Sequence, residues 1–234
     1  ARGEILIPLD EEAVKALVPQ LKQLRVQSVA VGFLHSYANS AHEERVRDLL
    51  IDADPNLYVT LSSEVCPEIR EYERLSTACA NAYIQPVMSG YLANLRDELV
   101  RRGYVCPIFM MTSGGGLMTL DAAIDLPIRL MESGPAGGAI LASHIAAECQ
   151  LEKVVSFDMG GTTAKICLIE NYEPQTARSF EVDRTARFLK GSGLPLRIPV
   201  IEMLEIGAGG GSIARVDEMQ QITVGPDSAG ANPG

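Results

Sequence analysis

Four glycine-rich turns constrain the fold of this 234-residue chain more than any other feature, because each follows a predicted strand or opens a predicted helix. They are residues 113–116 (SGGG), 133–138 (SGPAGG), 158–163 (DMGGTT) and 207–212 (GAGGGS). Glycine lets the main chain approach a ligand closely, and clustered main-chain N–H groups bind phosphate oxygens without basic side chains. One such turn indicates only a tight chain reversal, whereas four together favour an anion-binding protein.

The segment 157–163 is the most specific of the four. An apolar strand is predicted to end at Asp158, and a second strand is predicted soon after Thr163. The resulting hairpin tip offers main-chain N–H groups and the hydroxyls of Thr162 and Thr163 beside one carboxylate. Phosphates and a hydrated Mg²⁺ require such groups, with Asp158 holding the metal through water. Neither a Walker loop nor a Rossmann fingerprint fits, and a plain hairpin with an exposed aspartate remains the alternative.

Hydrophobic periodicity predicts an α/β fold, because helical and strand patterns alternate along the chain. The main predicted strands are 28–34, 57–61, 107–112, 154–157 and 166–169. Helices are expected after Asp10 as an N-cap, after Ser40–Glu43 as a capping box, and over 68–102 with a break or bend at Pro86. The continuous apolar run 28–34 predicts a strand that helices cover on both faces, and 154–157 predicts another buried strand.

Gly103 is placed where a C′ glycine would end the long helix, so we expect a domain boundary there. Residues 1–104 are expected to form a partial first α/β lobe with connecting helices, and residues 105–234 a second lobe that carries the phosphate loops. The run 70–74 (REYER) lies in the long helix. Its charges are compatible with a solvated face, including a Glu71–Arg74 pair, or with a face toward a cleft or a partner.

Composition limits the partners and the compartment. Thirty acidic against twenty basic residues give a net charge of −10, which argues against nucleic acid or an anionic membrane as the main partner. Five scattered cysteines without a C-x-x-C pair argue against a disulfide framework or a zinc knuckle. No apolar run reaches the roughly 18 residues of a membrane span, and the first residues lack a signal-peptide stretch. We therefore expect a soluble, cytoplasmic protein.

The glycine turns belong to a set of longer motifs. These are 70–74 (REYER), 132–138 (ESGPAGG), 158–163 (DMGGTT) and 205–212 (EIGAGGGS), with 35–39 (HSYAN) and 224–231 (VGPDSAGA) beside them. Together they resemble the hydantoinase/oxoprolinase family, and within it the A-type subunits, over essentially the whole chain. A lone D-x-G-G-T would indicate only the wider actin, sugar-kinase and Hsp70 superfamily.

The resemblance implies a two-lobed, actin-like ATPase fold with ribonuclease-H-like lobes, in which helices flank mixed sheets and ATP and Mg²⁺ bind in the cleft. Such enzymes spend ATP to open a cyclic amide such as a hydantoin or 5-oxoproline, or to carboxylate acetone and acetophenone. An A-type subunit usually works with a B-type partner. The resemblance assigns Asp158 to catalysis and to the metal, and the nucleotide to Gly160, Gly161, Thr162, Thr163, Gly134, Gly137, Gly138, Gly207, Gly209, Gly210, Gly211 and Ser212.

Two departures from the family pattern qualify this expectation. The family has an earlier D-x-G-G-T loop that is absent here, which implies an internal fragment of a larger subunit that is inactive alone. Lys165 stands where many relatives carry an acidic residue. Three alternatives to a cyclic amide hydrolase stay open: an acetone-carboxylase-type subunit, a sugar-kinase-like phosphotransferase, and a non-catalytic assembly module whose glycine loops are structural.

Overall fold

The computed structural model describes residues 3–185, 189 and 191–230 of the chain. The chain forms two compact units, of which unit 1 comprises 1–112, 116–131 and 178–199, and unit 2 comprises 113–115, 132–177 and 200–234. Three segments beyond residue 104 therefore pack with unit 1. The lobe division at residues 104 and 105 stays a prediction.

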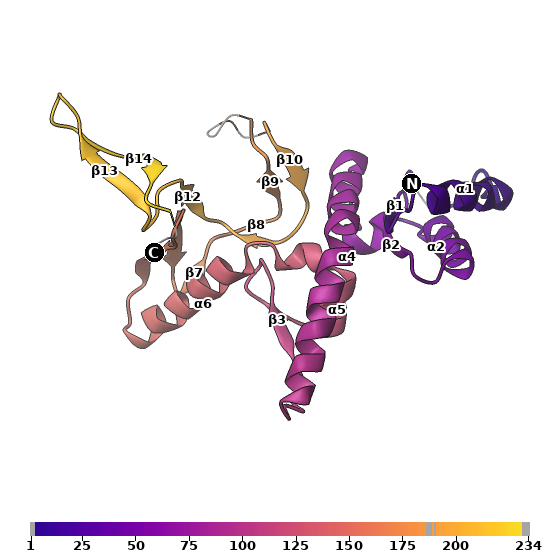
Figure 1. Ribbon diagram of the computed structural model, residues 1–234, viewed down its shortest axis with the longest axis horizontal. Helices are drawn as coiled ribbons and strands as arrows, with labels where there is room; N and C mark the ends of the chain where they lie inside the picture. Colours follow the sequence, from indigo (N-terminus) through magenta and orange to yellow (C-terminus); the bar gives the residue numbers. More distant parts are fainter. Residues whose placement is uncertain (1–2, 186–188, 190, 231–234) are drawn as a thin grey trace. The chain divides into compact units, whose positions relative to one another are not determined.

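Unit 1 is built around a long helix and a short parallel sheet. Its elements are α1 (Glu11–Gln23), β1 (Ser28–Val31), α2 (Ala41–Ala53), β2 (Tyr58–Leu61), α3 (Ser62–Val65), α4 (Glu71–Arg101), β3 (Phe109–Met111), β4 (Leu117–Thr119), α5 (Leu120–Asp125), the 3₁₀ helix η1 (Pro127–Leu130), β9 (Phe180–Val182) and β10 (Leu194–Leu196). Strands β1 and β2 are parallel and lie between α4 on one side and α1 with α2 on the other (Figure 1). Helix α4 continues through Pro86, so the helix is not broken there, and the alternative of a bend stays a prediction.

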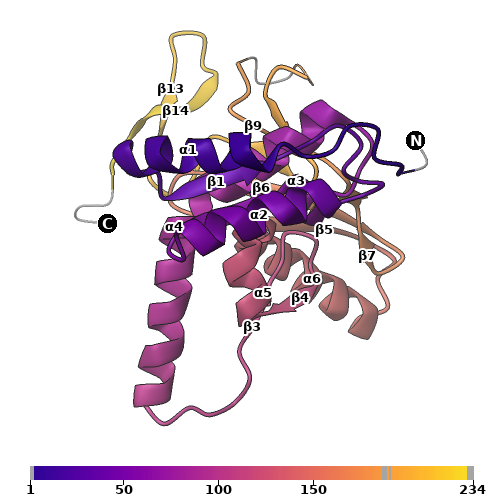
Figure 2. The ribbon, with the colours of Figure 1, turned by 90° about the vertical axis from the view of Figure 1, so that its right-hand side faces the viewer.

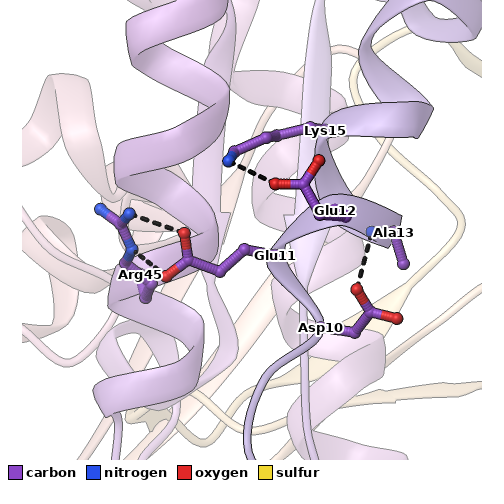
Figure 3. Close-up of polar contacts among 6 residues, drawn as sticks. All are labelled: Asp10, Glu11, Glu12, Ala13, Lys15 and Arg45. Carbon is purple, nitrogen blue, oxygen red and sulfur yellow. Dashed lines mark hydrogen bonds and ion pairs between the residues drawn. The ribbon is translucent and has the colours of Figure 1, made fainter.

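Local sequence explains how α1 begins and how it is held to α2. The carboxylate of Asp10 accepts a hydrogen bond from the N–H of Ala13 at 3.0 Å, which confirms the predicted N-cap (Figure 3). Arg45 of α2 donates to both carboxylate oxygens of Glu11 at 2.8 Å. The two helices lie side by side in Figure 2 and bury Val14 against Val46 beneath them. The ion pair is exposed, so apolar burial supplies most of the stability.

The predicted capping box at the start of α2 is wrong. Ser40 precedes the helix, but its side chain does not cap the main chain and instead donates to Glu44. Glu43 is fully buried, where its two oxygens accept four hydrogen bonds, from the N–H of Phe33 (2.9 Å), the hydroxyl of Ser62 (2.7 Å), and the N–H (2.9 Å) and hydroxyl (2.7 Å) of Ser63. The Glu43 carboxylate therefore belongs to a tertiary hydrogen-bond network and does not cap α2, as the local sequence pattern had predicted.

Arg74 extends the same buried network from α4. Its guanidinium is fully buried and donates to the hydroxyl of Ser62 at 3.2 Å and to the main-chain oxygens of Phe33 (2.9 Å) and Glu68 (2.6 Å). The Glu71–Arg74 pair on a solvated face is thus not formed, and Arg70 pairs with Glu73 instead. Because Ser62 bonds to both Glu43 and Arg74, one hydroxyl links two buried charges of opposite sign.

Unit 2 contains the larger sheet. Its elements are α6 (Ser133–Glu148), β5 (Lys153–Met159), β6 (Ala164–Glu170), β7 (Glu173–Pro174), β8 (Thr176–Ala177), β11 (Val200–Ile201), β12 (Leu204–Ile206), β13 (Ser212–Val216) and β14 (Ile222–Ser228). Strands β12, β6 and β5 form an antiparallel sheet in that order, with β7 paired to β6. Strands β13 and β14 form a separate hairpin, drawn in yellow in Figure 1.

Helix α6 covers one face of this sheet. Ala136 and Ala139 of the helix pack against Cys167 and Ile169 of β6 in a buried cluster. The expectation that residues 154–157 form a buried strand is wrong for the described residues, because Phe157 of β5 is 57% exposed on the face away from α6. Among the residues with assigned structure, none of the helices is long and apolar enough to span a bilayer.

Glu43 is expected to make stability depend on pH. Burial alone would raise the pKa of Glu43, but hydrogen bonds from Ser62, Ser63 and Phe33 outweigh burial and hold this pKa below its ordinary value. A carboxyl with a lowered pKa contributes stability above the pH at which the unfolded carboxyl titrates, about 4.3. That contribution is lost as the pH falls through the folded-state pKa.

We therefore predict that Glu43→Gln lowers the free energy of unfolding at pH 7 by about 1–3 kcal/mol, because its amide places a donor among donors. Urea unfolding between pH 7 and pH 3.5 measures this effect. The wild-type protein should lose more stability on acidification than the variant does. Glu44→Gln, at an exposed position on the same helix, should behave as wild type. Equal acid sensitivity of wild type and Glu43→Gln would refute the role assigned to this carboxylate.

Candidate functional site

The most specific sequence motif forms the predicted hairpin. Strands β5 and β6 pair from Lys153–Glu170 to Met159–Ala164, and residues 160–163 make the turn between them. The N–H of Gly160 donates to the carbonyl of Thr163 at 3.0 Å and closes the turn. Asp158, one residue before the end of β5, is exposed.

A second glycine loop packs directly on this hairpin tip. The N–H of Gly210 donates to the carbonyl of Gly160, and the N–H of Gly211 to the carbonyl of Gly161, both at 2.9 Å. Within the second loop, the hydroxyl of Ser212 accepts from the N–H of Gly209 at 3.0 Å. Two of the four turns seen in the sequence, separated by almost fifty residues, therefore form one surface.

Gly209 is the closest point of contact between the two loops. A Cβ at this buried position would lie 2.6 Å from the carbonyl carbon of Gly161, 2.6 Å from the nitrogen of Thr162 and 2.7 Å from the oxygen of Gly160. These neighbours are main-chain atoms, which cannot rotate aside as a flexible side chain can. Only glycine fits here, for a steric reason that the sequence pattern alone does not reveal.

The third motif, at 133–138, is not a turn. Helix α6 begins at Ser133, so Gly134, Gly137 and Gly138 lie in its first two turns. No side chain caps the start of the helix, and the preceding residue Glu132 has a left-handed main chain with φ of 57°. The motif therefore presents a helix N-terminus, whose free N–H groups and positive dipole end favour anions.

The fourth motif, at 113–116, is a hairpin turn between β3 and β4. The N–H of Ile201 donates to the carbonyl of Ser113 at 2.9 Å, and Gly115 has φ of 82° with its main chain against Ile140. These contacts account for the turn structurally. We assign it no part in ligand binding.

A row of charged residues crosses the sheet next to the hairpin tip. Lys165 of β6 is in register with Asp158 of β5 on one side and with Glu205 of β12 on the other. Residues directly opposite one another in antiparallel strands point to the same face of the sheet. The ammonium of Lys165 forms an ion pair with Glu132, just before α6, and lies 3.9 Å from a carboxylate oxygen of Glu205. The ion pair with Glu132 connects the start of α6 to β6.

Where the hairpin tip meets the start of α6, the polar groups that have no partner inside the described part of the protein are several hydrogen-bond donors and one carboxylate. Within the described ranges, the N–H groups of Gly161 and Thr162 and the hydroxyls of Thr162 and Thr163 have no hydrogen-bond partner, and Asp158 has no ion pair. No group of three or more histidine, cysteine or carboxylate side chains is arranged to hold a metal ion in the part of the chain described. The open N–H and hydroxyl groups at this junction are of the kind that binds anions.

Family comparison agrees with the motifs. Residues 74–234 match the family described as hydantoinase/oxoprolinase, and residues 1–53 match the hydantoinase/oxoprolinase N-terminal region. The chain belongs to the hydantoinase/oxoprolinase family, which confirms the resemblance inferred from the motifs. An uncharacterized protein of Methanocaldococcus jannaschii is 42% identical over this whole chain and 35% of its own length. The caprolactamase subunit alpha of Pseudomonas jessenii is 34% identical over 99% of this chain and 32% of its own length.

Two solved structures share the fold. The ATP-dependent caprolactamase from Pseudomonas jessenii superposes with a TM-score of 0.76 at 33% identity, over all of this chain and 33% of that one. A nucleotide-free acetone carboxylase, from a study of ATP-dependent acetone carboxylation, gives a TM-score of 0.75 at 27% identity, over 96% of this chain and 31% of that one. The expected fold class is confirmed. The chain spans about a third of the length of these relatives.

Gly209 offers a direct test of how the two loops pack. Gly209→Ala should lower the free energy of unfolding by about 1–3 kcal/mol, because its methyl group would overlap main-chain atoms. Gly138→Ala is the matched control, since a Cβ there meets nothing within 4 Å and alanine favours a helix by up to about 1 kcal/mol. Thermal unfolding of both variants measures the difference. A fully stable Gly209→Ala protein would show that the loops are not in contact.

Proposed function

We propose that the chain is the nucleotide-binding part of an ATP-dependent enzyme that opens a cyclic amide. The observation that carries this proposal is the packing of the 209–212 loop on the 160–163 tip, beside the start of α6. Two segments that favour anions through main-chain N–H groups, the tip and the start of α6, lie together there, and the 209–212 loop holds the tip through its own N–H groups. The structural similarity to the ATP-dependent caprolactamase from Pseudomonas jessenii supports the same proposal.

Each part of the site has a proposed task. The N–H groups of Gly161 and Thr162 and the hydroxyls of Thr162 and Thr163 would hold phosphate oxygens, and Asp158 would hold Mg²⁺ through water. Gly160, whose N–H closes the turn, would shape the tip around the phosphates. The glycines at 134, 137 and 138 would let phosphates approach α6 closely, and the loop from Gly207 to Ser212 would support the tip. When bound, Mg-ATP would supply a phosphoryl group to the amide oxygen, which would make the amide carbon reactive toward water.

The donor set fits this group on two counts. The open donors at the tip are neutral and belong to the main chain or to threonine, which suits a phosphate in a chain of net charge −10. Gly209 carries no Cβ, so the tip and its supporting loop can lie close enough to act as one cradle.

We further propose a cytoplasmic protein that works with a partner subunit. The caprolactamase relative is itself named as a subunit. Residues 75–95 of α4 contain no charged side chain, yet Tyr83 is 84% exposed, Val87 75% and Tyr91 59%. An uncharged, apolar helix face of this length is typical of a surface that another protein covers. All five cysteines are free thiols, which suits a reducing compartment.

A second candidate function is an ATP-dependent carboxylase subunit, which the structural similarity to acetone carboxylase favours. Both functions use the same phosphate site and differ in what receives the phosphoryl group. Stimulation of ATP hydrolysis by hydantoins and lactams, against stimulation by small ketones with bicarbonate, separates them.

The site predicts how nucleotide binding responds to substitution. In the full-length protein, Asp158→Ala should weaken Mg-ATP binding about tenfold or more, because the carboxylate that holds the metal is removed. Isothermal titration calorimetry measures the affinity. Asp48→Ala, at an exposed position on α2, is the control and should bind as wild type. Absence of nucleotide binding by the wild-type protein, or normal binding by Asp158→Ala, would exclude the proposed site.

A further inference from the structure

Asp158, Lys165 and Glu205 form the charged row next to the hairpin tip. Lys165 is the only cation of this row among the residues that the structure describes. Its side chain is 15% exposed, and its ammonium contacts Glu132 and lies 3.9 Å from Glu205. Glu132 precedes α6, whereas Glu205 lies on β12, so two different elements direct carboxylates at one ammonium. Asp158 is directly opposite Lys165 in β5 but has no ion pair.

The carboxylates around Lys165 affect how an anionic ligand can bind. Asp158, Glu132 and Glu205 bring three negative charges to the junction of the hairpin tip and α6. A triphosphate would meet repulsion from all three. Lys165 cancels one of these charges and engages the two glutamates.

We propose that Lys165 is a positioning residue for the nucleotide, whose ammonium offsets Glu132 and Glu205 so that a triphosphate can approach and Asp158 is left to hold magnesium. This inference rests on the proposed function. It gives Lys165 a reason to stand where the family resemblance leads one to expect an acidic residue. It also assigns a role to Glu132 and Glu205, which begin two of the sequence motifs but had no task assigned to them.

A purely structural ion pair would have a different signature. If Lys165 only fastened α6 to the sheet, its loss would disturb the whole pocket and weaken every adenine-containing ligand alike. If Lys165 balances charge, the loss of binding affinity on its substitution should grow with the number of phosphates on the ligand. The comparison of ATP, ADP and adenosine therefore separates the two roles.

The test is isothermal titration calorimetry on the full-length protein with Mg-ATP, Mg-ADP and adenosine. Lys165→Met should weaken Mg-ATP binding about tenfold or more, Mg-ADP binding less, and adenosine binding hardly at all. Lys165→Arg keeps the charge and should stay within about threefold of wild type. Adding Glu205→Gln to Lys165→Met should restore most of the lost Mg-ATP affinity, since one uncompensated carboxylate is removed.

The outcomes distinguish this inference from the proposed function. If the wild-type protein binds neither Mg-ATP nor Mg-ADP, the proposed function fails. If the wild type binds both and Lys165→Met loses nothing, or loses equally for all three ligands, only the role of Lys165 is overturned. Should Lys165→Met not fold, Glu205→Gln alone decides, because it should tighten Mg-ATP binding about twofold without changing adenosine binding. Unchanged or weaker Mg-ATP binding by Glu205→Gln would then overturn the role.

Discussion

The close approach of Gly209 to the main chain of the 160–163 turn holds the candidate site together. Two hydrogen bonds, from Gly210 to Gly160 and from Gly211 to Gly161, fix the loops at this distance. The carbonyl groups of the tip are thereby used inside the protein, while the N–H groups of Gly161 and Thr162 stay open. The interaction thus selects which main-chain groups a ligand can reach, and it works only because no Cβ intervenes.

The hairpin tip also explains how a chain with an excess of acidic residues could bind an anionic ligand. Main-chain N–H groups attract phosphate without adding a formal charge, and the start of α6 adds a dipole of the right sign. Lys165 contributes the formal positive charge and pairs with carboxylates from two elements. Local groups can therefore determine what binds even where the net charge is −10.

The elements that the sequence predicted well are those that local chemistry decides. The cap at Asp10 and the hairpin around 158–163 depend on neighbouring residues, and both formed as expected. The helix start at Ser133 was mistaken for a turn, because glycine and proline are compatible with both structures.

The features that could not be predicted from the sequence depend on contacts between residues that are far apart along the chain. Glu43 matches a capping box locally, but hydroxyl and N–H groups about twenty residues away take its carboxylate. Arg74 sits in a charged run and is nevertheless buried. The contact between Gly209 and the hairpin tip follows from the pairing of β12 with β6, a long-range register that a single sequence leaves open.

Hydrogen–deuterium exchange on the full-length protein tests the central claim most directly. Addition of Mg-ATP should slow exchange in peptides covering 157–164 and 206–212 together, because one ligand would engage the tip and stabilise the loop beneath it. Slower exchange elsewhere in the protein, with both of these peptides unchanged, would show that nucleotide binds at another place and would contradict the account.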